Sequence, residues 1–317
     1  MPNYNNRLNL PNDTSLPFFD YGIFKPGQLA YPKIKNLVNK QDIKSAEITY
    51  RMKIRDGIPI LTNAQNNYYK TKGVIMTFKN GQKAYEIISN TFFEDFYEWK
   101  TLKIDGDDVN VLFGKRIRRG SDTILNEIEK EDYDGKNDPF FNETIDIIEN
   151  YLNRNKDQKI MIDSKKHLKI KIKHNRNLKN NKSYDYINDF FELQKNYMLL
   201  WSSIERYTDI KYNETTKKKN NYRFSEEKAF RDGMNKNQNK YHKTVFSTKD
   251  LEKYGFYPTD SYRTIDYYYT FRCNVVHRGK ASYFDYTMLE TATMELLEIF
   301  KNALEDTWNE RNLFNSD

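Results

Sequence analysis

The first third of the chain consists of short apolar runs that turn residues interrupt. Alternation of apolar and polar positions predicts four strands, at residues 17–22, 46–54, 72–78 and 99–104. Residues 84–89 predict a short helix between the last two strands. Together these elements predict an α+β domain over residues 16–115, formed as a small barrel or curved sheet. The polar, Asn-rich residues 1–15 predict a flexible arm.

Helical periodicity replaces this pattern in the second half of the chain. Apolar residues recur at helical spacing in four segments, at residues 141–152, 187–204, 262–277 and 286–308. The pattern predicts an all-α helical bundle over residues 139–312, preceded by a charged linker at residues 116–138. Residues 160–173 predict a basic β-hairpin inserted into this bundle, and residues 211–243 predict a polar segment that is mobile in part.

The composition fits two folded domains. With 317 residues, the chain is long enough for each domain to have its own core, and aromatic residues (15%) compensate for a hydrophobic content of only 38%. No apolar run approaches the ~20 residues that span a bilayer, and no signal-peptide pattern is present, so we expect a soluble, cytoplasmic protein without a membrane partner. The single cysteine, Cys273, excludes an internal disulfide and a cysteine-based zinc site, and we expect no metal or cofactor.

Positive charge is concentrated in two segments. The net charge is +7, with nine Lys/Arg against one acid in residues 159–182 and ten against four in residues 211–243. Localised positive charge favours polyanions, RNA or DNA first among them. A solvated, lysine-rich surface is the alternative explanation of the same composition.

The segment Phe271–Lys280 carries the residues best suited to chemistry on phosphate. It places Arg272, Asn274 and His277 in an apolar, aromatic helical run that stops at Gly279. The negative end of a helix dipole favours the imidazolium form of His277, and an arginine offers a planar fork of donors for phosphate oxygens. A structural role is the alternative, in which His277 caps the helix and Arg272 pairs with a carboxylate.

These three residues could cleave RNA without a metal ion. The ribose 2′-OH would attack the adjacent phosphorus, His277 would transfer protons, and Arg272 would stabilise the charge on the phosphoryl oxygens, with Asn274 as an orienting residue. On an ideal helix Asn274 and His277 are about 60° apart, whereas Arg272 and His277 are about 140° apart. The site therefore requires a loosened last turn or a second subunit.

The motif Arg272-x4-His277, followed by Gly279-Lys280 and an amphipathic helix, resembles the signature of the HEPN superfamily, as does the aromatic segment Trp201–Arg206. The resemblance covers residues 138–310. It implies a helical bundle, a homodimer with a composite site, and metal-independent endoribonuclease activity of the kind linked to toxins, defence or RNA processing. An inhibitor or antitoxin protein is a further partner that it suggests.

Two consequences of this resemblance concern individual residues. The expected RNA contacts are the lysines of the predicted hairpin and the basic residues beside the histidine, namely Lys169, Lys171, Lys173, Arg278 and Lys280. Gly279 stands where some members carry a tyrosine, so a switch by tyrosine modification is not expected. The superfamily also contains members that only bind RNA or nucleotides, and this non-catalytic function remains an alternative.

The segment Phe18–Gly27 resembles the Tyr-Gly-x-Leu loop of the γ-glutamylcyclotransferase-like fold, over residues 16–115. This resemblance implies a ligand loop formed by four residues, Tyr21, Gly22, Ile23 and Phe24. The catalytic glutamate of that family falls on Phe92 or Phe93 here, and Glu94 replaces it only if the register slips. We therefore expect a ligand-sensing or scaffolding domain, with a γ-glutamylcyclotransferase-like enzyme as the alternative.

Overall fold

The computed structural model describes most of the chain, in two compact units. The described residues are 7–55, 57–65, 69–115, 132, 133, 135, 138–157, 182–212, 214, 216–237, 244–247, 252–278 and 283–309. The first unit consists of the residues up to Phe140 together with Asp209–Asn213 and the end of the chain from Thr307, and the second consists of Phe141–Thr208 and Glu214–Asp306. In the described part of the chain, no helix combines the length and the apolar character needed to cross a bilayer.

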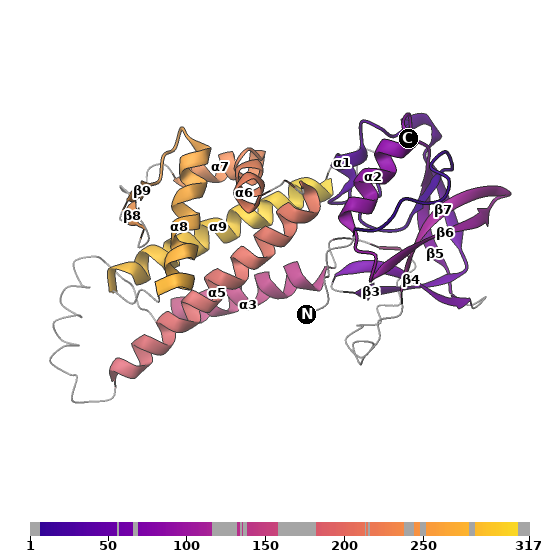
Figure 1. Cartoon of the computed structure of the whole chain (residues 1–317). Coiled ribbons are helices and arrows are strands. Elements are labelled where there is room, and N and C mark those ends of the chain that lie inside the picture. The colour runs from indigo at the N-terminus through magenta and orange to yellow at the C-terminus, as the bar shows by residue number, and fades with distance from the viewer. Residues whose placement is uncertain are drawn as a thin grey trace. The chain divides into compact units, whose positions relative to one another are not determined.

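A five-stranded mixed sheet forms the centre of the first unit (Figure 1). Its strands, in spatial order, are β2 (Lys44–Ile48), β5 (Thr71–Met76), β1 (Phe18–Asp20), β7 (Asp107–Gly114) and β6 (Tyr97–Ile104). The short strand β1 lies in the middle, antiparallel to β5 and parallel to β7. A separate antiparallel ribbon joins β3 (Tyr50–Arg55) to β4 (Ile58–Gln65).

The described strands form an open sheet, so the predicted small barrel is wrong. The strands β2 and β6 are the two edges of the five-stranded sheet and are not paired with each other. The predicted strand at 46–54 is divided at Thr49, and its second half, β3, leaves the sheet to pair with β4. The sequence pattern did not predict the strands β4 and β7, whose short apolar runs are combined with polar residues and do not alternate over their full length.

Helices and aromatic rings complete the first unit. The helix α2 (Gly81–Thr91) begins at Asn80, whose side chain accepts a hydrogen bond from the backbone N–H of Lys83, a standard N-cap. Its Tyr85 packs edge-on against Phe18 of β1 and Trp99 of β6, with ring centroids 6.2 and 5.3 Å away. The predicted helix at 84–89 is thereby confirmed and extended. The shorter helices are α1 (Tyr31–Ile34) and the 3₁₀ helix Lys40–Asp42.

The residues that precede β1 are held against this sheet instead of forming a loose arm. Leu8 is buried, and its backbone N–H donates to the carbonyl of Phe92 at 3.2 Å. The indole Nε1 of Trp99 donates to the carbonyl of Asn9 at 2.9 Å, and Asn110 donates through Nδ2 to the carbonyl of Asp13 at 2.7 Å. Three side-chain or backbone anchors therefore fix residues 8–13, which the polar composition did not predict.

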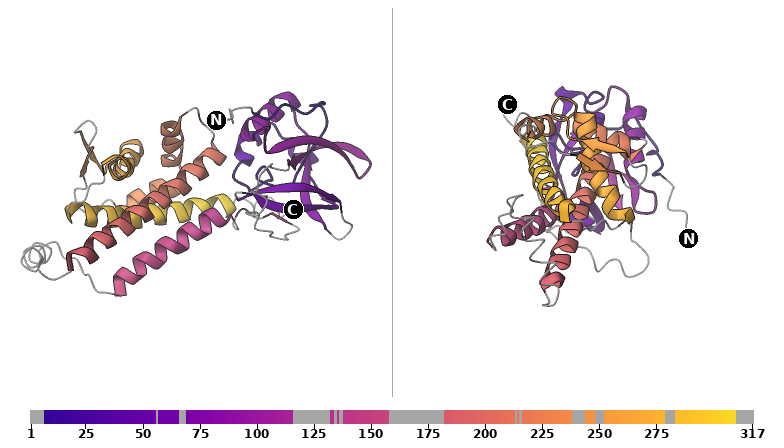
Figure 2. Two further views of the ribbon diagram at one scale, coloured as in Figure 1. Left: turned by 60° about the horizontal axis from the view of Figure 1, so that its bottom comes forward. Right: turned by 90° about the vertical axis from the view of Figure 1, so that its left-hand side faces the viewer.

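The second unit is predominantly helical (Figures 1 and 2). Its helices are α3 (Pro139–Asp157), α5 (Lys182–Lys211), α6 (Lys217–Ser225), α7 (Lys228–Asn237), α8 (Ser261–Arg278) and α9 (Tyr283–Asn309). The long helices α3, α5 and α9 lie side by side along their lengths in both figures. The four helices predicted from apolar spacing are confirmed, whereas the predicted hairpin at 160–173 lies outside the described residues.

Two features of this unit differ from the prediction. Residues 217–237 form α6 and α7 instead of a mobile segment, because Phe224, Phe230 and Met234 supply a buried face beneath the charged residues. A small hairpin of β8 (Thr244–Phe246) and β9 (Lys253–Gly255) packs against α8, so the unit is not all-α. Three-residue strands are too short to give a reliable periodic signal.

The core of the second unit is aromatic, and its tyrosine hydroxyls form hydrogen bonds. Trp201, Tyr197 and Tyr268 are fully buried. The hydroxyl of Tyr197 donates to the carbonyl of Tyr268 at 2.6 Å, and the hydroxyl of Tyr268 donates to Oε2 of Glu295 at 3.0 Å. Buried hydroxyls must be paired in this way, because an unpaired one costs about 1–3 kcal/mol. The network connects α5, α8 and α9.

Candidate functional site

The Arg-Asn-His motif lies in the last two turns of α8. The helix begins at Ser261 and ends at Arg278, so its backbone includes Arg272, Asn274 and His277, one position before the end. The side chains of His277 and Arg278 are outside the described part of the structure. Lys169, Lys171, Lys173, Gly279 and Lys280 also lie outside it. The expected RNA contacts of these residues therefore stay predictions.

Arg272 projects from α8 towards α5. Its Nη2 lies 3.3 Å from Oε1 of Glu205, and its guanidinium carbon lies 5.6 Å from the ring centroid of Tyr269. The side chain is 22% exposed, and its buried Nε–H has no hydrogen-bond partner among the described residues. The arginine thus pairs with a carboxylate, as the structural alternative predicted, but keeps a donor that is not used.

Glu205 also pairs with a second cation. Its Oε2 lies 2.6 Å from Nζ of Lys217, in the first turn of α6. The Glu205 side chain is only 12% exposed, whereas that of Lys217 is 57% exposed. Two cations therefore share one carboxylate, which leaves a net positive charge where α5, α6 and α8 meet. A site of this charge suits an anionic group.

Asn274 has a structural contact that the sequence did not indicate. It is 4% exposed, and its Nδ2 donates to the carbonyl oxygen of Phe246 at 2.8 Å. The amide donor is therefore directed at the backbone of β8, and the predicted role of Asn274 in orienting a phosphate or the imidazole has no support from this contact. The partner lies 28 residues earlier in the chain, in a strand that sequence reasoning missed.

The strand that Asn274 holds carries an exposed aromatic ring. Val245 of β8 is buried, whereas Phe246 is 55% exposed. In the antiparallel register Phe246 lies opposite Lys253 of β9, and the ammonium of Lys253 lies 5.8 Å from the centroid of the phenylalanine ring. An exposed ring beside a cation is a feature of nucleic-acid surfaces, and no motif in the sequence indicated it.

Cys273 stands between Arg272 and Asn274 in the same helical turn. It is not part of a disulfide and is partly buried. No other cysteine occurs in the chain. Among the described residues there is also no group of three or more His, Cys, Asp or Glu side chains arranged to hold a metal ion.

The predicted ligand loop of the first unit is closed. Tyr21, Gly22, Ile23 and Phe24 are all buried. The hydroxyl of Tyr21 donates to the carbonyl of Leu112 at 2.8 Å and accepts from the backbone N–H of Leu61 at 3.1 Å. A Cβ added at Gly22 would lie 2.7 Å from Cγ of Pro59, so the chain passes too closely for a side chain. The loop is packed as core and presents no surface to a ligand.

The backbone N–H of Gly22 in this loop donates to the side chain of Asp20. Oδ1 of Asp20 accepts from the N–H of Gly22 at 3.0 Å, and its buried Oδ2 has no hydrogen-bond partner among the described residues. Burial raises the pKa of Asp20 to about 7, although hydrogen bonds and the charge of Lys25 oppose the increase. The N–H of Gly22 is therefore already bonded to this carboxyl group, which is partly protonated near neutral pH because of its raised pKa.

Parts of the predicted linker pack on the same loop. The buried Lys25 forms an ion pair with Asp132 and donates to the carbonyl of Tyr133 at 3.0 Å. The backbone N–H of Gly135 donates to Oε1 of Gln28 at 3.1 Å. These described residues of the 116–138 stretch thus belong to the folded first unit, because they supply partners for polar groups that would otherwise be buried alone.

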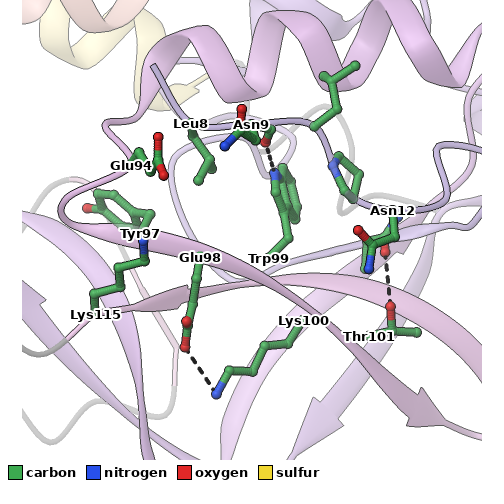
Figure 3. Close-up of a pocket in the computed structure, with 13 residues that line it drawn as sticks. Leu8, Asn9, Asn12, Glu94, Tyr97, Glu98, Trp99, Lys100, Thr101 and Lys115 are labelled. Carbon is green, nitrogen blue, oxygen red and sulfur yellow. Dashed lines mark hydrogen bonds and ion pairs between the residues drawn. The ribbon is translucent and has the colours of Figure 1, made fainter. Parts of the chain in front are cut away.

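A cleft of about 240 Å³ lies elsewhere on the first unit, between residues 8–12 and β6 (Figure 3). Glu94, which could replace the family's glutamate only with a shifted register, lines this cleft with Tyr97 and Trp99. Glu98 is paired with Lys100 there, at 3.2 Å. None of the four residues of the predicted ligand loop lines the cleft. The structure therefore does not bring Glu94 and that loop together in one pocket.

No family profile, curated protein or solved structure matches this chain. The two family resemblances consequently depend on the motifs quoted above and on the described geometry around them.

Proposed function

We propose that the second unit is a metal-independent endoribonuclease of the HEPN type, in which Arg272 and His277 carry the chemistry. The observation that supports this best is the state of Arg272. Its guanidinium is anchored by Glu205 at 3.3 Å, is partly exposed, and retains an Nε–H without a partner in the described structure. An arginine that is oriented by an ion pair and partly solvated can donate to a phosphate oxygen with little loss of side-chain entropy.

The proposed reaction needs no cofactor. The 2′-OH of a ribose loses its proton to an imidazole, and its oxygen forms a bond to the adjacent phosphorus. The bond from phosphorus to the 5′-oxygen of the next nucleotide breaks, and an imidazolium gives that oxygen a proton. The products are a 2′,3′-cyclic phosphate and a 5′-OH. Arg272 stabilises the negative charge that builds on the non-bridging oxygens.

A second copy of the chain completes this site in the proposal. Arg272 and His277 are about 140° apart around α8, and Arg272 is directed at Glu205 on α5. One helix therefore cannot present both groups to one phosphate without unwinding. Two copies of α8 placed side by side bring an arginine and two imidazoles to one phosphate, so that one imidazole removes a proton while the other donates one.

The test is cleavage of single-stranded RNA by the purified protein in EDTA. We expect 2′,3′-cyclic phosphate ends, and the loss of cleavage in His277→Ala and Arg272→Ala. The matched control is Arg263→Ala, which removes an exposed arginine in the first turn of the same helix that pairs with Asp260 at 3.4 Å and lies over the ring of Tyr257 at 5.1 Å. Cleavage by His277→Ala at the rate of the unaltered protein would rule out this function.

A non-catalytic RNA-binding protein is the second candidate, and the geometry of Asn274 favours it. Its amide donates to the carbonyl of Phe246, so this residue of the motif is not directed at a reacting group. Salt-sensitive RNA binding without cleavage, weakened in Arg272→Ala, would support this function over the first.

A further inference from the structure

The strand that carries the exposed ring of Phe246 packs on α8 through Asn274, on the side of the helix that is nearer to His277 than to Arg272. The carbonyl of Phe246 accepts a hydrogen bond from Asn274, which on an ideal helix lies about 60° from His277 and about 160° from Arg272. The buried Val245 fixes the strand on the other side. The backbone that carries this ring is therefore held on the His277 side of α8 by a partly buried hydrogen bond of 2.8 Å, and a second copy of the chain supplies the arginine that faces this side in the proposed composite site.

The surroundings of the ring combine an apolar face with positive charge. Phe246 is 55% exposed, although an apolar ring is more stable when it is removed from water. The ammonium of Lys253 lies 5.8 Å from its centroid, on the partner strand. A nucleotide matches this pair, because its base has an apolar face that stacks on a ring and its phosphate carries the opposite charge to lysine.

We propose that Phe246 is a base-stacking residue which, with Lys253, holds an unpaired base of single-stranded RNA beside the scissile phosphate. This inference rests on the proposed ribonuclease site and adds the residue that positions its substrate. In this arrangement Asn274 acts through Phe246: it sets the position of the stacking ring and does not touch the phosphate. An exposed ring without sequence-specific hydrogen bonds accepts any base, so the stacking step selects unpaired over paired RNA.

The first experiment measures binding of a fluorescein-labelled, single-stranded 2′-O-methyl RNA, which lacks the attacking hydroxyl and stays intact. We expect Phe246→Ala to weaken binding by about 5- to 150-fold and Phe246→Trp to retain it. Phe191→Ala is the matched control, because Phe191 is a similarly exposed phenylalanine (51%) on α5 of the same unit. A thermal melt of each variant verifies that the fold is retained.

The second experiment distinguishes stacking from a general effect on the surface. A set of RNAs is used in which a single base is removed at a different position in each. For the unaltered protein, removal of the base at one position should weaken binding about as much as Phe246→Ala does. In Phe246→Ala the same base removal should cost almost nothing, since the ring that it stacked on is absent. An undiminished penalty in Phe246→Ala, or equal affinities of Phe246→Ala and Phe191→Ala, would overturn the proposal.

The remaining outcomes separate this inference from its alternatives. If Phe246→Ala dissociates a dimer in sedimentation, and excess protein restores RNA affinity, the ring belongs to a subunit contact and the proposal is wrong. If base removal weakens binding to the unaltered protein but not to Phe246→Ala, and natural RNA is never cleaved, the proposed nuclease function fails while the stacking role of Phe246 stands. If RNA is cleaved but base removal weakens binding to both proteins equally, only the stacking role fails.

Discussion

Nη2 of Arg272 lies 3.3 Å from Oε1 of Glu205, and the other oxygen of this carboxylate lies 2.6 Å from the ammonium of Lys217. Three helices thus meet at one carboxylate that is almost buried. The carboxylate fixes the direction of the arginine without cancelling the positive charge of the two cations. Glu205 is therefore a positioning residue in the proposed reaction, and its removal should separate RNA binding from cleavage.

The first prediction concerns Glu205→Gln. Removing the negative charge should keep or increase RNA affinity, because both cations remain. The cleavage rate at saturating RNA should fall by about tenfold or more, since a misdirected arginine loses part of its transition-state contact. Single-turnover kinetics measure both quantities, and Glu192→Gln, an exposed glutamate of the same helix paired with Lys195, is the control. A rate that stays unchanged would remove Glu205 from the mechanism.

The second prediction concerns Asn274→Asp. A carboxylate oxygen replaces the Nδ2 donor opposite the carbonyl of Phe246, so the free energy of unfolding should fall by about 1–3 kcal/mol in urea titrations. RNA affinity should also decrease, as expected for Phe246→Ala. Asn302→Asp, on an exposed position of α9, should change neither quantity. A loss of affinity at unchanged stability would instead indicate that Asn274 contacts the RNA itself.

The third prediction is a pH dependence of stability that Asp20 causes. Burial raises its folded-state pKa to about 7 from an ordinary value of 3.8, so the folded protein retains a proton that the unfolded chain releases. The free energy of unfolding should therefore fall as the pH rises from about 4 to about 8, by up to ~4 kcal/mol for this group. Below pH ~4 both states are protonated and the full contribution is present.

Asp20→Asn imitates the protonated acid and tests this pH dependence. The variant should lose most of the slope between pH ~4 and ~8 and should be more stable than the unaltered protein at the upper end. Asp95→Asn, at an exposed position of the same unit, should keep the original slope. If both variants have the same slope, Asp20 does not titrate in this range.

The fourth prediction concerns Gly73→Ala in β5. A Cβ at this position would lie 2.6 Å from the backbone oxygen of Asp20 and 2.6 Å from Cζ of Phe19. Because the first of these atoms belongs to the central strand β1, relief requires the sheet to shift, and stability should fall by about 1–3 kcal/mol or more. Urea unfolding measures the loss, and Lys72→Ala, at the exposed neighbouring position, should cost less than half as much.

The sequence predicts the parts of this fold that local periodicity determines. Long amphipathic helices such as α5 and α9 repeat their pattern over many turns, so their existence is predictable. The open sheet is not, because β1 pairs with β7, whose partner residues lie more than 90 positions away in the chain. The sequence pattern did not reveal the helices α6 and α7, since three large buried apolar residues in a segment rich in lysine do not give a clear period.

The candidate site shows the same limit at the level of single residues. The chemistry proposed for Arg272 and His277 was inferred from residue type and spacing alone. Neither Glu205 as the partner of Arg272 nor Phe246 as the partner of Asn274 is predictable, because both contacts join separate elements. Side-chain roles that depend on a tertiary neighbour therefore require the structure, even when the motif is visible in the sequence.

Cys273 gives this protein a spectroscopic probe that requires no engineering. A nitroxide or fluorophore attached to the only thiol of the chain is located next to Arg272, in the turn before His277. Within an assembly of two copies, the separation of two such labels, read by pulsed electron resonance or energy transfer, measures the distance between the two motifs. A short distance between the labels, with a distribution that shifts or narrows when RNA is added, would report the formation of the proposed composite site in solution.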